Sequence, residues 1–186
     1  MGPLGGAFYG PLLTYLRNEL GYDKHSLSLF PYDWRQDCAA IAQVLQRHII
    51  KFYRCCGDRK ITLLAHSMGG LIARYCVDVL PGLDQYIEQV ITMGTPHKGA
   101  PDAFEALRRG APLPLNWGRR ATAKPLRTFP SAYQLLPTGP LLPDSAYFVQ
   151  DYNKKEIDIF GETERDWLLT DHWNMLREAK LFHQKL

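Results

Sequence analysis

The sequence predicts an α/β fold, in which a mostly parallel sheet is covered by helices. Short apolar runs that suit strands alternate with segments whose apolar residues recur at helical spacing. The 186 residues are 46% hydrophobic and 22% charged, a composition typical of one globular domain with a packed core. Alternation of this kind favours a parallel sheet with covering helices.

The predicted elements can be placed in chain order. They are a helix over 11–20 ending at Gly21, a short buried strand over 26–30, a helix over 37–54, a strand over 61–65, a helix over 69–80, a strand over 89–93 ending at Gly94, and a last helix that Thr170 or Asp171 caps and that runs to the C-terminus. Within this last helix we expect Trp173, Leu176, Ala179 and Lys180 among the repeat positions.

The helix over 37–54 shows the clearest amphipathic pattern. Its apolar stripe, at the spacing of a helix packed on a sheet, consists of Ile41, Val44, Leu45, Ile49 and Phe52. His48 falls on the same stripe, which favours a histidine at the edge of the core over a ligand.

Residues 110–143 differ in character from the rest, because they are rich in proline and contain a basic patch. The segment has one short helical pattern, at 131–136. It is too long for an ordinary connection and too apolar for a disordered linker, which suits a lid or cap over a site. We therefore expect one domain over 1–186, with 110–143 as its lid.

The pentapeptide Ala-His-Ser-Met-Gly at 65–69 lies between a strand-like run and a helical pattern, as in a nucleophile elbow. In such an elbow a serine sits on a sharp, strained turn that exposes its hydroxyl. Small residues must flank the turn because strand and helix cross closely, and Ala65 and Gly69 meet this need. The pattern predicts Ser67 as a nucleophile; the alternative is a tight turn with a surface serine.

Two further segments sharpen this interpretation: Phe-Pro-Tyr-Asp-Trp-Arg at 30–35 and Thr-Met-Gly-Thr-Pro-His-Lys-Gly-Ala at 92–100. Together with the elbow they resemble the lecithin:cholesterol acyltransferase family of α/β hydrolases. The Tyr-Asp-Trp-Arg tetrapeptide is the motif that distinguishes this family, since the other two motifs also occur in many lipases. Residues 127–137 and 179–183 look like later segments of bacterial members, so the resemblance spans nearly the whole chain. It implies a serine esterase that cleaves an acyl chain from a lipid and in some members passes it to an alcohol.

The expected chemistry centres on Ser67, which would attack an ester carbonyl. The backbone N–H of Met68, at the start of the following helix, is the expected first oxyanion donor. His66 lies inside the elbow but points away from the hydroxyl in this geometry, which favours a packing role.

The substrate-binding residues that we expect are Asp33, Trp34 and His97. Asp33 and Arg35 lie at the carboxyl end of a strand, where α/β sheets place ligands; the alternative is a buried ion pair. Several aromatic residues either cover an acyl groove or belong to the core, namely Trp34, Trp117, Phe129 and Tyr133.

The family order of catalytic residues is serine, then an acid, then histidine. His97 precedes any plausible acid, and His172 and His183 lie in a helix that the family places before the acid-bearing strand. We therefore expect the acid and base beyond residue 186, the first strands before residue 1, and a fold incomplete at both ends. Residues 2–6 are then a remnant of the second oxyanion loop or a flexible start.

Composition excludes several other functions. A net charge of +3 without a long basic run argues against nucleic acid as a partner. The four cysteines lack metal-ligand spacing, so we predict free thiols, no metal and no cofactor. We find no membrane-spanning run and no signal peptide, which by default indicates a cytoplasmic location. Arg74 and Asp78 are expected to form a weak i, i+4 surface pair.

The sequence thus predicts a serine-dependent lipid acyl hydrolase or O-acyltransferase that works through an acyl-enzyme on Ser67. Its partners would be a lipid ester substrate and a membrane or lipoprotein surface; the oligomeric state stays open. Two alternatives remain: a carboxylester lipase without acyl transfer, and an inactive lipid-binding or interaction domain that lacks the triad acid and base. By itself the chain is expected to be weakly active or inactive.

Overall fold

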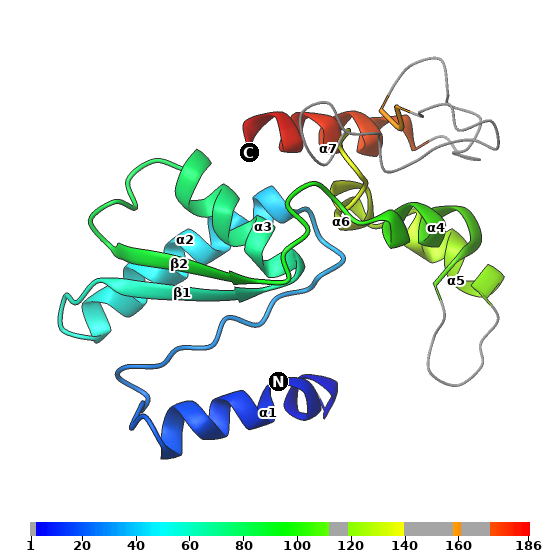
Figure 1. The fold of residues 1–186 in the computed structure, drawn as a ribbon. Coiled ribbons are helices and arrows are strands. Elements are labelled where there is room, and N and C mark those ends of the chain that lie inside the picture. Colours follow the sequence, from blue (N-terminus) through cyan, green and yellow to red (C-terminus); the bar gives the residue numbers. More distant parts are fainter. Residues whose placement is uncertain (1–2, 112–118, 140–157, 161–171) are drawn as a thin grey trace.

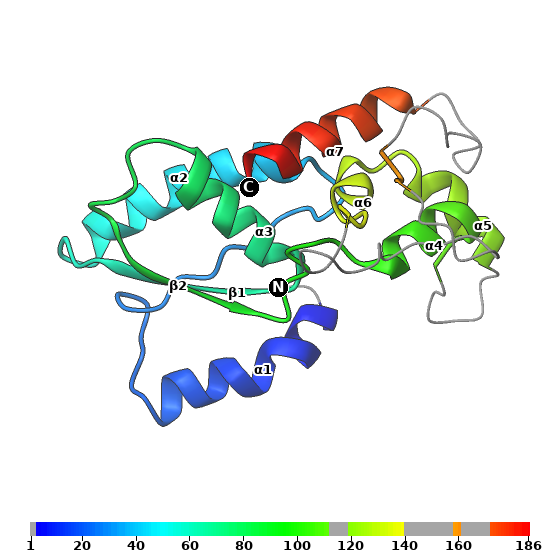
Figure 2. The ribbon, with the colours of Figure 1, turned by 45° about the horizontal axis from the view of Figure 1, so that its top comes forward.

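A computed structural model describes residues 3–111, 119–139, 158–160 and 172–186 (Figure 1). Strands β1 (Ile61–His66) and β2 (Ile87–Met93) form a parallel two-stranded sheet in these residues. Helices α2 (Cys38–Cys55) and α3 (Met68–Arg74) cover one face of the sheet, and helix α1 (Pro3–Asn18) lies on the other (Figure 2). This arrangement, a parallel sheet covered by helices, is the one that the sequence predicts.

Helix α2 begins one residue after the predicted start, because Asp37 is its N-cap: Asp37 Oδ1 accepts a hydrogen bond of 2.8 Å from the Ala40 amide. Its buried stripe consists of Cys38, Ile41, Ala42, Leu45 and Ile49. Val44 is 47% exposed, so its predicted place in the stripe is wrong: Val44 lies at the outer border of the apolar arc. His48 lies at the core edge, where its Nε2 is 2.8 Å from Ser28 Oγ, in agreement with the prediction.

The strands pair in register from Thr62 opposite Gln89 to His66 opposite Met93. Both strands were expected, and β2 begins two residues earlier than predicted. The predicted strand over 26–30 is wrong, because these residues form no ladder and Leu29 is 38% exposed. The Ser26 and Leu27 amides donate instead to the Asp23 carbonyl, which closes a local turn. Apolar character favours burial, but only a neighbouring backbone with free partners makes a strand.

Helix α3 continues into a π-helical turn, η1 (Tyr75–Val79), in which the Leu80 amide donates to the Tyr75 carbonyl. The helix predicted over 69–80 is therefore present but changes its winding halfway. Arg74 Nε lies 3.1 Å from Asp78 Oδ2 on its exposed side, the surface pair that the spacing predicts.

Three helices lie beyond the carboxyl ends of the strands: α4 (Pro101–Arg109), α5 (Arg119–Leu126) and α6 (Pro130–Gln134). Helix α4 was not predicted, and residues 110–143 hold two described helices where one was expected. Residues 112–118 and 140–143 of the predicted lid lie outside the described residues. One hydrophobic core lies among α2, α3 and η1. A second core joins α4 and α6 to the last helix, α7 (Trp173–Lys185), through Phe104, Leu107, Ala132, Tyr133, Leu136, Ile159, Leu176 and Ala179.

The two ends of the chain correct the predictions. Helix α1 begins at Pro3 and contains Pro11, so residues 3–6 are neither a loop remnant nor a flexible start. Helix α7 has His172 at its N-cap, while the expected caps at 170 and 171 lie outside the described residues. Its buried positions include Phe182, and Lys180 is exposed, because the charged side chain stays in water.

Candidate active site at the strand-to-helix turn

Ser67 occupies a strained turn between β1 and α3. Its φ of 53° and ψ of −130° lie outside the regions that most side chains adopt, and its side chain is exposed. Among the described residues, only Asp58 is another non-glycine residue with positive φ. The Ser67 amide donates to the Met93 carbonyl at 2.9 Å, and its carbonyl accepts from the Gly70 amide at 3.0 Å. The geometry is that of the predicted elbow.

Close packing behind the serine explains why the turn needs glycine. A Cβ at Gly70 would lie 2.6 Å from Thr95 Cγ2 and 2.7 Å from Thr95 Cβ. A Cβ at Gly69 would meet only Tyr32 Oη, at 3.4 Å, an ordinary contact. The structure therefore places the tighter requirement at Gly70. Thr95 belongs to the loop after β2, so two motifs of the sequence meet here.

Met68 opens α3, and its side chain is buried in the core beneath the turn. Its backbone N–H belongs to the first turn of the helix, where amides lack an intrahelical acceptor. Such amides and the helix dipole favour negative charge next to Ser67. The position suits the oxyanion donor that the sequence predicts.

His66 is held by helix α1 and not by Ser67. Its Nδ1 lies 2.8 Å from Tyr9 Oη, and its ring lies 5.4 Å from the ring of Phe8. The expected packing role agrees with this geometry. Tyr9 was not predicted from the sequence, because its partner is 57 residues away.

The Tyr-Asp-Trp-Arg segment leaves the sheet region near the elbow. Tyr32 is half-buried, and burial, with Cys38 and Tyr9 nearby, raises its pKa to about 12. Its hydroxyl therefore stays protonated beside Gly69. Tyr32 was not expected at the site, although it stands in the discriminating tetrapeptide.

The next residues form an exposed ion pair. Arg35 donates to both carboxylate oxygens of Asp33, at 2.8 and 2.7 Å, and these bonds hold the pKa of Asp33 well below its usual range. The alternative of a buried pair is therefore wrong: the segment runs along the rim, where both groups remain hydrated.

Aromatic residues of this segment meet the segment predicted as a lid. Trp34 is exposed and packs edge-to-face on Phe129, with ring centroids 5.4 Å apart. The Arg35 guanidinium lies 6.0 Å from the centroid of the same ring. Tyr133, by contrast, is fully buried and donates its hydroxyl to the Arg127 carbonyl, so it belongs to the core. Trp117 lies outside the described residues.

Three histidines follow Ser67 in the chain, and each has its own surroundings in the structure. His97 is exposed in the loop after β2, and His172 caps α7. His183 packs on Phe182, and its Nε2 is buried without a partner among the described residues. Burial, with Lys98 nearby, lowers its pKa to about 4 against the effect of a hydrogen bond with the Gln134 backbone. Within the described part of the chain, no hydrogen bond joins Ser67 to a histidine.

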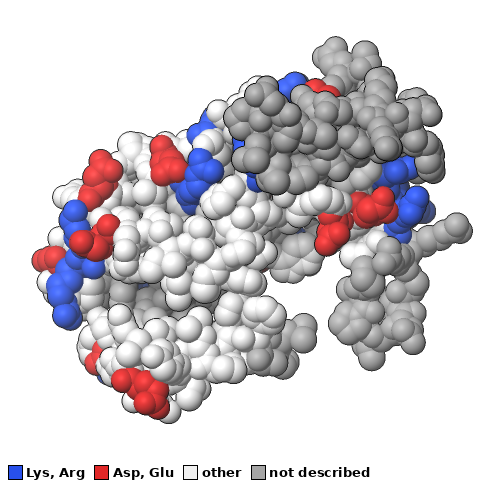
Figure 3. Space-filling view, in the orientation of Figure 1, with Lys and Arg blue, Asp and Glu red and all other residues white. Residues whose placement is uncertain are grey.

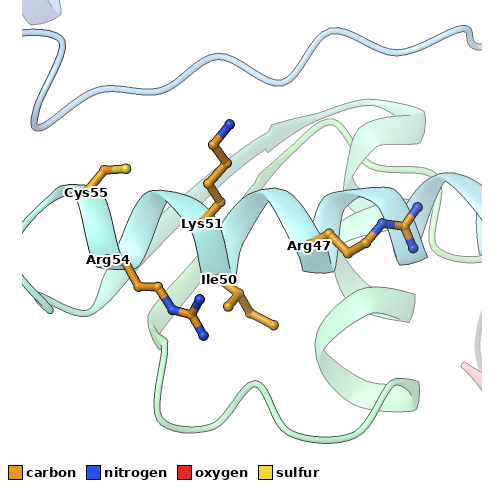
Figure 4. A pocket seen from close by; sticks show the side chains of 5 residues that line it. All are labelled: Arg47, Ile50, Lys51, Arg54 and Cys55. Atoms are coloured by element: carbon orange, nitrogen blue, oxygen red, sulfur yellow. The ribbon is translucent and has the colours of Figure 1, made fainter.

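A surface hollow among the described residues lies away from the elbow. It measures 340 Å³ and is lined by residues from the second half of α2, namely Arg47, Ile50, Lys51, Arg54 and Cys55 (Figure 4). This half of α2 lies beside the amino ends of the strands, whereas Ser67 follows the carboxyl end of β1. On the face that Figure 3 shows, the lobe formed by α1 is mostly uncharged, and its acidic side chains gather at one end.

The comparisons with known proteins identify the class. The family model of lecithin:cholesterol acyltransferase matches residues 7–179, and the chain belongs to this family. It accordingly has the α/β-hydrolase fold that the motifs predict. The Tle4 complex with Tli4, a crystal structure, superimposes with a TM-score of 0.58 at 16% identity, over 82% of this chain and 40% of that one.

Individual relatives match over shorter stretches. A phospholipase A(1), LCAT3, of Arabidopsis thaliana is 34% identical over 85 residues, 44% of this chain and 19% of its own length. A triacylglycerol lipase of Pseudarthrobacter phenanthrenivorans is 46% identical over 44 residues, 24% of this chain and 13% of its own. An uncharacterized protein of Saccharomyces cerevisiae is 28% identical over 84% of this chain and 22% of its own length. The chain thus spans less than a quarter of each of these relatives.

A membrane-spanning element is not found in the described residues, since none of their helices is both long and apolar enough to cross a bilayer.

Proposed function

We propose that this chain acts in lipid acyl hydrolysis or O-acyl transfer through an acyl-enzyme on Ser67. The observation that carries the proposal is the exposed hydroxyl of Ser67 on a strained strand-to-helix turn. A backbone in this conformation costs about 1–3 kcal/mol and persists chiefly where function requires it. Membership of the lecithin:cholesterol acyltransferase family supports a lipid ester as the substrate.

The proposed reaction has two steps. Ser67 Oγ attacks the ester carbonyl carbon, its proton passes to a base, and the alcohol portion leaves with a proton, which gives acyl-Ser67. Water or a second alcohol then attacks the acyl carbon and releases Ser67. The Met68 N–H stabilises the oxyanion in both steps, and loss of one such donor costs about 100 to 1,000-fold in rate.

The proposed binding region lies beyond the carboxyl ends of β1 and β2. Asp33, Trp34 and His97 line it, and the described helices of residues 110–143 act as its lid. The contact between Trp34 and Phe129 supports this arrangement, because it joins the rim of the sheet to that segment. Closure of the lid over an acyl chain would exclude water from the acyl-enzyme.

A lipid-binding or interaction domain without turnover is the second candidate. It is favoured by one observation: among the described residues no histidine is hydrogen-bonded to Ser67. A serine hydroxyl is a weak nucleophile until a base accepts its proton. We therefore expect slow turnover by this chain, below that of a complete triad.

The test is hydrolysis of p-nitrophenyl butyrate by the purified chain, its Ser67→Ala variant and a Ser26→Ala control, which removes an exposed serine from a distant turn. We expect activity that is small, lost in Ser67→Ala and kept in Ser26→Ala. A matching rate in parent and Ser67→Ala contradicts the acyl-enzyme. Added alcohol then separates transfer from hydrolysis, since transfer yields a new ester.

A further inference from the structure

The first half of α1 lies beside the end of β1, on the face of the sheet opposite α2 and α3 (Figures 1 and 2). The contact is made by Tyr9 Oη, 2.8 Å from His66 Nδ1, and by the Phe8 ring, 5.4 Å from the imidazole. His66 is the last residue of β1 and directly precedes Ser67. Helix α1 therefore holds the strand at the residue before the strained turn.

Strain at Ser67 requires support on both sides, because an unsupported turn relaxes to an ordinary backbone conformation. On the helix side, the Gly70 amide bonds the Ser67 carbonyl, and Gly70 packs against Thr95. On the strand side, the Ser67 amide bonds the Met93 carbonyl. The His66 side chain adds a third contact, since its hydrogen bond to Tyr9 and its ring contact with Phe8 join this side of the turn to α1.

We infer that Tyr9 is a positioning residue for Ser67. By holding His66, its hydroxyl keeps the peptide between His66 and Ser67 in one orientation, and thereby aligns Ser67 Oγ with the Met68 N–H. Tyr9 acts through His66 and does not touch the substrate. This inference rests on the proposed function of Ser67 as nucleophile.

The size of the effect follows from the bond that is removed. A hydrogen bond at this distance contributes about 1 kcal/mol net, which changes the ratio of aligned to relaxed turn roughly five-fold and so lowers the population of the aligned turn by at most about five-fold. Tyr9→Phe keeps the ring and its contacts and removes only the hydroxyl. Tyr15→Phe is the matched control, because Tyr15 lies on the same helix with an exposed side chain.

The experiment measures modification of Ser67 by an alkyl fluorophosphonate, followed by intact mass and peptide mapping. Ser67 Oγ forms a bond to phosphorus, the phosphorus–fluorine bond breaks, and fluoride leaves while the serine proton passes to solvent. We expect Tyr9→Phe to lower the limiting rate by at most about five-fold, at an unchanged probe concentration for half-maximal rate. Tyr15→Phe should match the parent chain. Tyr9→Phe combined with His66→Leu should be no slower than His66→Leu alone, because leucine has no atom that could bond Tyr9 and Tyr9 acts through His66.

Hydrogen exchange of peptides that cover 61–74 is the second readout, and it does not depend on chemistry. We expect faster exchange in Tyr9→Phe than in parent and Tyr15→Phe. If Ser67 is modified but Tyr9→Phe equals the parent in both measurements, the positioning inference is overturned and the proposed function stands. If Ser67 is not modified in the parent, the proposed function fails in this chain, and exchange alone decides the inference: equal exchange overturns it.

Discussion

Replacement of Gly70 by alanine tests the packing that shapes the elbow. Gly70 lies within α3. In an open helix, Gly→Ala stabilises by up to about 1 kcal/mol, because alanine loses less backbone entropy on folding. At this position the new Cβ would lie 2.7 Å from Thr95 Cβ, closer than real Cβ atoms approach. Rotation of the Thr95 side chain does not move its Cβ, so the backbone must shift.

Such overpacking costs about 1–3 kcal/mol, which exceeds the gain in helix propensity and reverses the sign of the effect. For a chain of this size, each kcal/mol shifts the midpoint of thermal unfolding by about 2–4 °C. We therefore expect Gly70→Ala to lower the Tm by several degrees. Gly69→Ala, whose new Cβ meets only Tyr32 Oη at 3.4 Å, should leave the Tm unchanged or raise it slightly.

The assay is thermal unfolding followed by circular dichroism, with a double variant as the decisive control. Thr95→Gly removes the atoms that the alanine would meet, so Gly70→Ala should cost less in that background than in the parent. A Gly70→Ala chain as stable as Gly69→Ala would refute the steric reasoning. So would an equal cost of Gly70→Ala in both backgrounds.

Three further results are expected. Gln134→Leu should lower the free energy of unfolding by about 1–3 kcal/mol in urea denaturation. The buried side-chain oxygen of Gln134 accepts a hydrogen bond from the Cys38 backbone amide, and the substitution leaves this amide unpaired. A smaller loss would argue against this contact. The pKa of His183 is lowered to about 4, so the folded chain is fully stable above about pH 6.5 and loses about 3 kcal/mol at most as the pH falls toward 4. His183→Leu should flatten this pH dependence of the free energy of unfolding between pH 7.5 and 5. An unchanged slope would contradict the assignment. Maleimide should label exposed Cys55 in the native chain but should label Cys76 only after urea unfolds the chain, because burial raises the pKa of the Cys76 thiol to about 12. Rapid labelling of Cys76 in the native chain would contradict its burial.

Local patterns in the sequence determined the parts of the fold whose causes are local. The helix predicted over 37–54 is α2, within one residue at each end, because its amphipathic pattern and the Asp37 cap depend on neighbouring residues alone. The elbow at Ser67 followed from small residues between a strand-like run and a helical pattern. The Tyr-Asp-Trp-Arg segment and the loop after β2 identified the family, which the family model confirms.

Tertiary structure alone decided the features that depend on distant partners. Residues 26–30 are apolar enough for a strand but have no ladder, since strand formation needs a second backbone and not only hydrophobicity. Tyr9 reached the elbow, and Gln134 the start of α2, across separations of 57 and 96 residues that no periodicity encodes. Asp33 and Arg35 were paired as their spacing allows, but their exposure depended on where the rim of the sheet lies. The sequence predicted Ser67 as the nucleophile, whereas the fold decided what holds this residue in place, because strain at one residue is balanced by contacts from several elements.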